Sequence, residues 1–382
     1  MQSLLSEYRV LDQEIYFDDA EESLKYAKNN PGSIITRITN EITSDEIEVP
    51  MRKKNHLSLK TPSMILEYLN RYIVAQNCAK ETVSLAMYYH SLKMQYATNN
   101  NIQSNGPIMI IGPTGSGKTY LIQKACEHIN TTFIHVDTSS MVPEGIMGYS
   151  ISSLAKEILE KTEYRLNKAE HCVVFFDEID KLFTKKDATE YGETIAYQLL
   201  RLLEGTKIQL SDTDKKKLPP GVQGELDTSK MQFILGGAFQ WILDSKSEKK
   251  VNMGFNREVK ENIALEITLE DLYKNDIPKE LLGRMSSIVN LFKLEEEDYY
   301  NILNSEGSPL KEFIYKVEFH GDKVVVDTDT LRKIAQYSAQ SKLGVRAIKQ
   351  VLKVMFHDAL FLAAEGAMKT HYITFDKDKL DL

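Results

Sequence analysis

The stretch Gly112-Pro-Thr-Gly-Ser-Gly-Lys118-Thr119, reading GPTGSGKT, decides how the rest of this chain of 382 residues is interpreted. An apolar run at 108–111 precedes it and predicts a buried parallel strand. Residues 120–129 follow it with the apolar spacing of a helix. Strand, glycine-rich loop and helix in this order form the setting of a Walker A phosphate loop. The sequence therefore predicts a nucleoside triphosphate site at this point of the chain.

Each residue type in the loop has a physical role in holding phosphate. Glycines allow the backbone to curl until successive N–H groups point at an anion, and the helix N-terminus adds partial positive charge. Lys118 can reach the β- and γ-phosphates, and the Thr119 hydroxyl can ligate Mg²⁺. The predicted nucleotide-binding residues of the loop are Gly112, Pro113, Thr114, Gly115, Ser116, Gly117, Lys118 and Thr119.

A pair of carboxylates follows a second apolar run at 172–176, in the sequence Asp177-Glu178-Ile-Asp180. At the end of a buried strand, Asp177 can hold Mg²⁺ directly or through water. Glu178 can orient and polarise the attacking water. A bound cation would relieve the repulsion between the adjacent carboxylates. A solvated strand end is the alternative, but the phosphate loop favours a catalytic pair.

Strands and helices alternate through the middle of the chain. Strands are expected at 132–136, 172–176 and 232–235, helices at 154–169 and near 195–203, and loops at 207–227 and 245–260. This alternation predicts an α/β fold with a mainly parallel sheet and helices on both faces. From residue 291 the pattern is mostly helical, including one helix over 346–367, with strand-like segments at 324–326 and 372–375. We therefore expect a large α/β domain at 61–290, a smaller, mostly helical α+β domain at 291–382, and a small acidic module with a linker at 1–60.

Composition narrows the class of protein. Hydrophobic residues make up 42% of the chain, and the net charge of −8 does not suit a broad nucleic-acid footprint. Residues Cys78, Cys126 and Cys172 form no CxxC pair, so we expect buried free thiols and neither a cysteine zinc site nor a disulfide framework. No signal peptide and no membrane-spanning run is evident. These features favour a soluble protein of the cytoplasm.

Phosphoryl transfer also needs positive charge at the transition state. Arg284, in Leu281-Leu-Gly-Arg284-Met, and Arg346, in Lys342-Leu-Gly-Val-Arg346, are candidates. Taken from spacing alone, either arginine is equally well explained as an ordinary surface residue.

In their order, these residues resemble the ClpX family of AAA+ protein unfoldases and, more distantly, HslU. The resemblance covers about residues 61–375. Besides GPTGSGKT it includes Asp137-Thr-Ser-Ser, the segment from Lys161 to Lys181, LLRLLEGT at 199–206, Gly236-Gly-Ala-Phe239, the segment from Pro278 to Arg284, and Gly344-Val-Arg346.

The resemblance implies a homo-hexameric ring that hydrolyses ATP with Mg²⁺ and acts on protein substrates. On this analogy Ile73 and Val74 line the adenine pocket. Arg284 becomes an arginine finger inserted into the neighbouring subunit's site, and Arg346 becomes the sensor-2 residue that touches the subunit's own nucleotide. Lys118 and Glu178 complete the predicted catalytic set.

A tripeptide, Met253-Gly254-Phe255, resembles the Ile-Gly-Phe type with which ClpX docks onto the ClpP peptidase ring. An exposed Met and Phe on a polar loop suit insertion into a hydrophobic cleft. A Phe that packs in the core is the alternative. The resemblance thus implies a ClpP-like peptidase as partner.

The chain also departs from the family pattern. The four-cysteine zinc-binding N-terminal domain has no counterpart, and no polar sensor-1 side chain is evident after 232–235. The predicted pore loop reads Gly145-Ile146-Met147-Gly148, so that Ile146 occupies the position of a gripping aromatic residue. Two functions are therefore kept: a ClpX-type unfoldase and translocase that delivers substrates to a ClpP-like peptidase, and an ATP-gated remodelling or binding module without processive translocation.

Overall fold

The computed structural model describes residues 59–95, 106–143, 146, 148–183, 192–210, 212–220, 224–252, 266–275, 277–341, 343–366 and 369–380. The chain divides into two units, Met1–Ser58 and Leu59–Leu382. The predicted acidic module lies outside the described residues, which all belong to the second unit.

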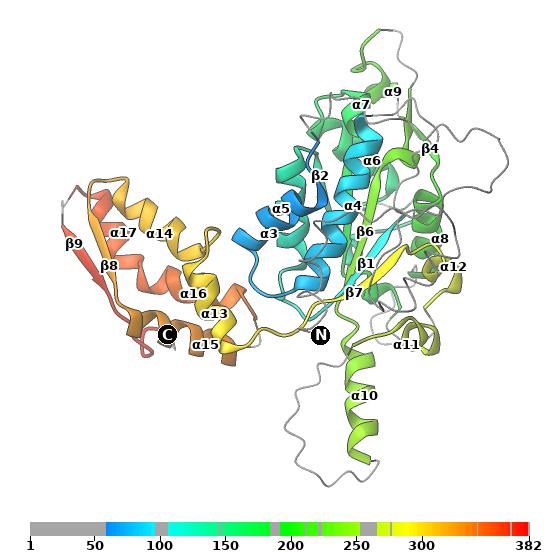
Figure 1. The fold of residues 1–382 in the computed structure, drawn as a ribbon. Coiled ribbons are helices and arrows are strands. Elements are labelled where there is room, and N and C mark those ends of the chain that lie inside the picture. Colours follow the sequence, from blue (N-terminus) through cyan, green and yellow to red (C-terminus); the bar gives the residue numbers. More distant parts are fainter. Residues whose placement is uncertain are drawn as a thin grey trace, which may run out of the picture. The chain divides into compact units, whose positions relative to one another are not determined.

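A sheet of five parallel strands forms the centre of the α/β part (Figure 1). Its order is β2-β3-β6-β1-β7. The strands are β1 (Ile108–Ile111), β2 (Phe133–Asp137), β3 (Val173–Asp177), β6 (Gln232–Gly237) and β7 (Ser287–Asn290). Each pair of neighbouring strands in the sheet runs parallel, with Ile108 opposite Ile234 on one side and Ser287 on the other. The predicted α/β class with a mainly parallel sheet is confirmed.

Helices cover both faces of this sheet. Each strand contributes residues to both hydrophobic cores, because successive side chains of a strand point to opposite sides. Ile108 and Ile110 pack with residues of α3 (Pro62–Tyr72), α4 (Asn77–Gln95) and α5 (Lys118–Ile129). Met109 and Ile111 belong to the other core. That core includes residues of α6 (Ile151–Lys161), α7 (Leu166–Ala169), α8 (Gly192–Leu203), α10 (Gln240–Asn252), α11 (Leu269–Lys274) and α12 (Lys279–Leu282). The sheet is therefore buried between two hydrophobic layers.

Two predictions for the region between β2 and β6 were wrong. The single helix expected at 154–169 is interrupted between α6 and α7, where Glu163 and Tyr164 adopt left-handed φ angles of 55° and 57°. The expected loop at 207–227 contains β4 (Lys207–Gln209) and β5 (Glu225–Asp227), which pair antiparallel, and a short helix, α9 (Asp212–Lys215). Strands of three residues are too short for an alternating pattern to reveal them.

The C-terminal part is mostly helical around a core of its own. Its helices are α13 (Glu296–Asn304), α14 (Pro309–Glu318), α15 (Thr328–Gln340), α16 (Arg346–Met355) and α17 (His357–Ala364), and β8 (Lys323–Val326) pairs parallel with β9 (Thr370–Ile373). The single helix predicted at 346–367 is wrong, because Phe356 separates α16 from α17 with its ring fully buried. The expected class for this part is confirmed.

All three cysteines are free thiols, but their burial differs from the prediction. Cys126 and Cys172 are buried as expected, whereas Cys78 is exposed near the start of α4. Within the described ranges, no helix combines the length and apolar character needed to cross a membrane.

Candidate nucleotide site

The phosphate loop joins the end of β1 to the start of α5. Gly115 and Gly117 have φ angles of +77° and +95°, which L side chains rarely adopt, so these positions need glycine. Ser116 N–H donates to the Pro113 carbonyl at 3.2 Å and closes the turn. The twelve-residue helix α5 then begins at Lys118, so its first N–H groups face the loop. The predicted strand, loop and helix are all present.

The loop fits a phosphate group in three respects. An added Cβ at Gly117 would meet no atom within 4 Å, which leaves space beside the helix N-terminus. The buried Ser116 hydroxyl has no hydrogen-bond partner among the described residues. The Lys118 ammonium donates to the backbone carbonyls of Gly112 at 2.6 Å and Pro113 at 3.2 Å. Burial lowers the pKa of Lys118, and the nearby carboxylates of Asp177 and Asp180 oppose this effect.

Asp177 lies at the end of β3, directly opposite the start of α5. Its Oδ2 accepts from the Thr119 hydroxyl at 3.1 Å and contacts His135 Nε2 at 3.4 Å, and its Oδ1 accepts from Glu178 N–H at 2.9 Å. Burial acts to raise the pKa of Asp177, but His135, Lys118 and these hydrogen bonds outweigh it and hold the pKa below its ordinary value. Asp177 is therefore ionised at neutral pH.

Thr119 and Asp177 are the predicted Mg²⁺ ligands. Among the described residues, no group of three or more His, Cys, Asp or Glu side chains is arranged to hold a metal ion. Mg²⁺ in nucleotide sites typically has one or two protein ligands and takes the others from water and phosphate oxygens. The adjacent hydroxyl and carboxylate fit that pattern.

Glu178 occupies a left-handed conformation, with φ 58° and ψ 30°, between β3 and the short 3₁₀ turn η2 (Ile179–Leu182). Its side chain lines the pocket. Burial raises the pKa of Glu178, and the carboxylates of Asp137 and Asp177 raise it further. The two neighbouring carboxyl groups therefore have pKa values displaced in opposite directions, which suits a metal-holding group beside a weak base.

Ile73 and Val74 line the same pocket after the end of α3. The buried Lys80 ammonium donates to the Ile73 carbonyl at 3.2 Å. Gln76 uses both ends of its amide on Phe292, accepting from the Phe292 N–H at 3.0 Å and donating to its carbonyl at 2.8 Å. The segment is thus held against the connection that leads to the C-terminal helices.

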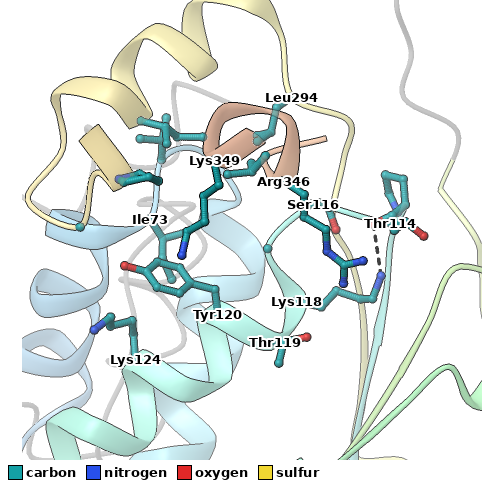
Figure 2. Close-up of a pocket in the computed structure, with 18 of the residues that line it drawn as sticks. Ile73, Thr114, Ser116, Lys118, Thr119, Tyr120, Lys124, Leu294, Arg346 and Lys349 are labelled. Atoms are coloured by element: carbon teal, nitrogen blue, oxygen red, sulfur yellow. Dashed lines mark hydrogen bonds between the residues drawn. The ribbon is translucent and has the colours of Figure 1, made fainter. Parts of the chain in front are cut away.

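Arg346 enters the pocket from the first turn of α16 (Figure 2). The phosphate loop and this helix are in direct contact, because Val345 N–H donates to the Gly115 carbonyl at 3.2 Å. Gly344 packs on Gly115 so closely that an added Cβ on Gly344 would lie 2.8 Å from the Gly115 carbonyl oxygen. The cavity between these elements has a volume of about 1070 Å³, ample for a nucleotide.

The structure brings together most of the predicted site residues. Those that line the cavity are Ile73, Val74, Pro113, Thr114, Gly115, Ser116, Gly117, Lys118, Thr119, Asp177, Glu178 and Arg346. Gly112 contributes its carbonyl to Lys118 from behind the loop. Arg284 does not line this cavity. Its guanidinium forms an ion pair with Glu204 at 2.6 Å, and about half of its side chain (52%) is exposed.

The predicted pore loop is described only in part. Gly145 and Met147 lie outside the described residues, whereas Ile146 is 40% exposed and Gly148 is exposed. An isolated bridge between Met141 and Tyr149 closes the base of the loop.

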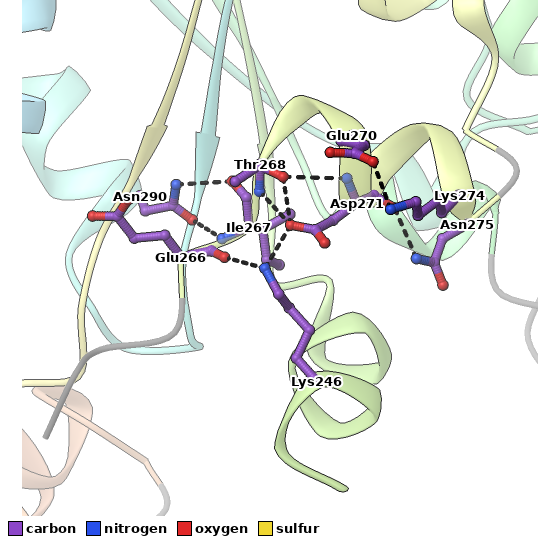
Figure 3. Close-up of polar contacts among 9 residues, drawn as sticks. All are labelled: Lys246, Glu266, Ile267, Thr268, Glu270, Asp271, Lys274, Asn275 and Asn290. Carbon is purple, nitrogen blue, oxygen red and sulfur yellow. Dashed lines mark hydrogen bonds and ion pairs between the residues drawn. The ribbon is translucent and has the colours of Figure 1, made fainter. Parts of the chain in front are cut away.

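The predicted docking residues Met253, Gly254 and Phe255 also lie outside the described residues. The preceding segment is not the loop that was expected, because α10 continues to Asn252. Lys246 on α10 donates to the Glu266 carbonyl at 2.7 Å and pairs with Asp271 at 2.6 Å, as Figure 3 shows. This contact ties the helix before the tripeptide to the chain that resumes after it.

Sequence reasoning assigned no role to several residues that line the cavity. Tyr120, Lys124 and Lys349 lie around it, and Asp180 lies beside Lys118. Lys349 follows Arg346 by three positions on α16, a spacing that places both on one helix face and could have indicated it. Asp180 is the last residue of the carboxylate motif in the sequence, but the motif does not indicate its contacts, because they are with residues far away in the chain.

Comparisons with known proteins agree with this geometry. The family model of the AAA domain (Cdc48 subfamily) matches residues 103–288. The chain is 27% identical to the ATP-dependent Clp protease ATP-binding subunit ClpX of Porphyromonas gingivalis over 356 residues, covering 89% of this chain and 85% of that protein. Proteins with the same name from Treponema denticola and Bacteroides thetaiotaomicron are also 27% identical, covering 80% and 86% of this chain and 78% and 84% of their own length.

The matched family region contains the phosphate loop and both carboxylates, and the ClpX relatives extend the likeness over most of the chain. With the nucleotide cavity described above, these findings identify the chain as an ATPase that is similar to the ClpX-type AAA+ proteins over most of its length.

Proposed function

We propose that this protein is an ATP-dependent unfoldase and translocase that works as a ring of six copies. The observation that carries the proposal is the division of the hydrolytic residues. Lys118, Glu178 and Arg346 share one cavity, while Arg284 lies outside that cavity with about half of its side chain exposed. A second copy would then supply a second guanidinium, that of Arg284, to the transition state.

Within one copy, the phosphate loop binds ATP through its N–H groups and through Lys118. Arg346 neutralises phosphate charge from the opposite side of the cavity, and Ile73 and Val74 hold the adenine. Mg²⁺ held by Thr119 and Asp177 would offset the negative charge that develops on the phosphate oxygens. Glu178 orients the attacking water and accepts its proton, and its raised pKa suits this role near neutral pH.

The ring proposal assigns Arg284 to the neighbouring copy's site. Such a finger makes hydrolysis depend on assembly and contributes about 10³–10⁵ in rate. We also propose that 61–290 and 291–382 act as two domains that face each other across the cavity, with 1–60 as a separate module. Changes in the Gly115–Gly344 contact would then link nucleotide state to domain position.

A ClpP-like peptidase is the proposed partner, and folded proteins are the proposed substrates. Support comes from the relatives, which are named as subunits of an ATP-dependent Clp protease. Met253, Gly254 and Phe255 remain the predicted docking residues. The three free thiols suit the reducing cytoplasm that we propose as its location.

The test combines assembly, hydrolysis and degradation. We expect the full chain to form a larger assembly with ATP by size-exclusion chromatography with light scattering, and to degrade a tagged folded protein when a ClpP-like peptidase is present. The Glu178→Gln variant should bind ATP and degrade nothing, so it serves as the control. ATP hydrolysis by single copies at dilutions where no assembly exists would refute the shared site.

A remodelling module without processive translocation is the second candidate. The observation that favours it is Ile146, an exposed aliphatic residue in the predicted pore loop. At this position, ClpX-type proteins typically have an aromatic residue that contacts the substrate chain. An aliphatic side chain offers less rigid contact area than tyrosine. The Ile146→Tyr variant separates the candidates, because a translocase should unfold its substrate faster while a remodeller should be unaffected.

A further inference from the structure

Asp180 is a buried carboxylate, with 4% of its surface exposed, and the proposed chemistry does not use it. Removing a carboxylate from water is costly unless polar partners compensate for it. Asp180 lies in the η2 turn, two residues after Glu178. Its Oδ2 accepts the backbone N–H of Phe239 at 3.1 Å, so it joins the turn that carries Glu178 to the segment after β6.

The close packing of Gly237 against Asp180 supports this connection. An added Cβ on Gly237 would lie 3.0 Å from Asp180 Oδ1 and 2.6 Å from the Phe239 ring. The Gly237 carbonyl in turn accepts the N–H of Gly112 at 3.0 Å, and the Gly112 carbonyl accepts from Lys118 at 2.6 Å. A continuous series of contacts therefore leads from Asp180 to the phosphate loop.

Both segments joined by Asp180 contain a non-glycine residue in the left-handed region. Glu178 has a φ of 58° and Phe239 a φ of 48°. Such conformations persist only where the surrounding structure holds them, and they concentrate at functional sites. Phe239 is held further by complete burial of its ring, which lies 5.5 Å from the ring of Trp241.

We propose that Asp180 is a positioning residue for Glu178: its hydrogen bond to Phe239 N–H fixes the strained turn against the end of β6 and keeps the Glu178 carboxylate in the cavity. The inference rests on the proposed catalytic role of Glu178. In this role Asp180 acts through the backbone. Its oxygen acceptor is the feature that this positioning role requires.

The test measures kcat and ATP affinity for the full-length variants Asp180→Asn, Asp180→Ala, Glu178→Gln and the double variant Glu178→Gln/Asp180→Ala. Asparagine retains an oxygen that accepts from Phe239 N–H, so D180N should stay within about fivefold of the original kcat. D180A should lose about 30- to 100-fold in kcat, the scale expected when a catalytic group is displaced by about 1 Å. ATP affinity should change by less than about threefold in both.

The double variant gives the readout that a merely structural role would not move. If Asp180 acts only through Glu178, adding D180A to E178Q should cost no further activity beyond about threefold. The control is Asp322→Ala, which removes another buried carboxylate that accepts a backbone N–H, from Lys369 at 3.2 Å, in the C-terminal part. Its kcat should stay within about twofold of the original per folded molecule.

Three results would overturn the inference: a D180A variant with unchanged kcat, a D180N variant as slow as D180A, or independent losses that multiply in the double variant. An unchanged kcat in E178Q would instead refute the proposed role of Glu178. Should D180A fail to fold, Gly237→Ala replaces it, because its methyl group would press on Asp180 and on the Phe239 ring. We expect it to lose at least about tenfold in kcat with ATP affinity retained, and an unchanged kcat would again overturn the inference.

Discussion

Replacing Gly115 by alanine tests whether the phosphate loop and the start of α16 are packed as the structure describes. Gly115 has a φ of +77°, and its added methyl carbon would lie 2.5 Å from the Leu343 carbonyl oxygen and 2.9 Å from Gly344 Cα. Ordinary contact begins near 3.4 Å, so residues 343–344 must withdraw by about 0.9 Å. That movement would break the hydrogen bond from Val345 N–H to the Gly115 carbonyl.

The expected cost has three parts. The left-handed backbone costs an alanine about 1–2 kcal/mol, the overpacking about 1–2 kcal/mol, and the lost hydrogen bond about 1 kcal/mol. We therefore expect Gly115→Ala to lower the free energy of unfolding by about 3–5 kcal/mol. The matched control is Gly117→Ala, where φ is +95° but the methyl group meets nothing within 4 Å, so only the backbone cost of about 1–2 kcal/mol applies.

Urea denaturation of the full-length, nucleotide-free proteins measures both values, followed by the fluorescence of Trp241 and by far-ultraviolet circular dichroism. Gly344→Ala should behave like Gly115→Ala, because its methyl group would lie 2.8 Å from the Gly115 carbonyl oxygen. Equal destabilisation by Gly115→Ala and Gly117→Ala would show that the loop and residues 343–344 are not in contact, and would refute the reasoning.

Three further predictions concern catalysis, assembly and stability. Glu178→Gln should lower kcat by about 10²–10³-fold with ATP affinity retained. Because the pKa of Glu178 is raised, the kcat of the wild-type protein should begin to fall in acid at a pH above 4.5, and a pH profile that is still flat at 4.5 would contradict this. Arg284→Ala should lower kcat by about 10³-fold in the assembled protein. Glu204→Gln removes only the exposed ion pair with Arg284 and should change the free energy of unfolding by less than about 1 kcal/mol. Comparable losses of kcat in the two variants would argue against Arg284 as an arginine finger. Lys246→Met should cost about 1–2 kcal/mol at pH 7 in urea denaturation, because it removes two hydrogen bonds from partly exposed groups. The pKa of its partner Asp271 is lowered to about 2, because the contacts with Lys246 and Thr268 outweigh burial. The stabilisation by the pair is therefore complete above pH 3.8 and is lost as the pH falls through about 2. A loss of unfolding free energy in Lys246→Met that grows in acid would exclude the assigned pair.

The phosphate loop and its setting were predictable because their information is contiguous in the chain. A buried strand, a glycine-rich turn and a helix start are each encoded within a few residues, by apolar periodicity and by the φ angles that only glycine adopts easily. The same holds for the apolar strand that ends at Asp177, and for the α/β class that follows from repeated alternation. The N-cap of α3 is local in the same way, because the Thr61 hydroxyl accepts from Met64 N–H three residues further on.

Other features of the site depend on contacts between residues far apart in the sequence. The left-handed Glu178 turn and the bond of Asp180 to Phe239 require β3 and β6 to lie side by side, and no local pattern contains that information. The ion pair of Arg284 with Glu204 joins residues eighty positions apart.

The contact between Gly115 and Gly344 likewise joins the phosphate loop to the segment before α16. Phe356, which separates α16 from α17, has its ring buried in the C-terminal core. Local sequence thus determined which groups can bind phosphate, because their conformational preferences act over one or two turns. Long-range packing alone determined how those groups are aimed, because a side chain's position depends on neighbours that only the folded chain brings together.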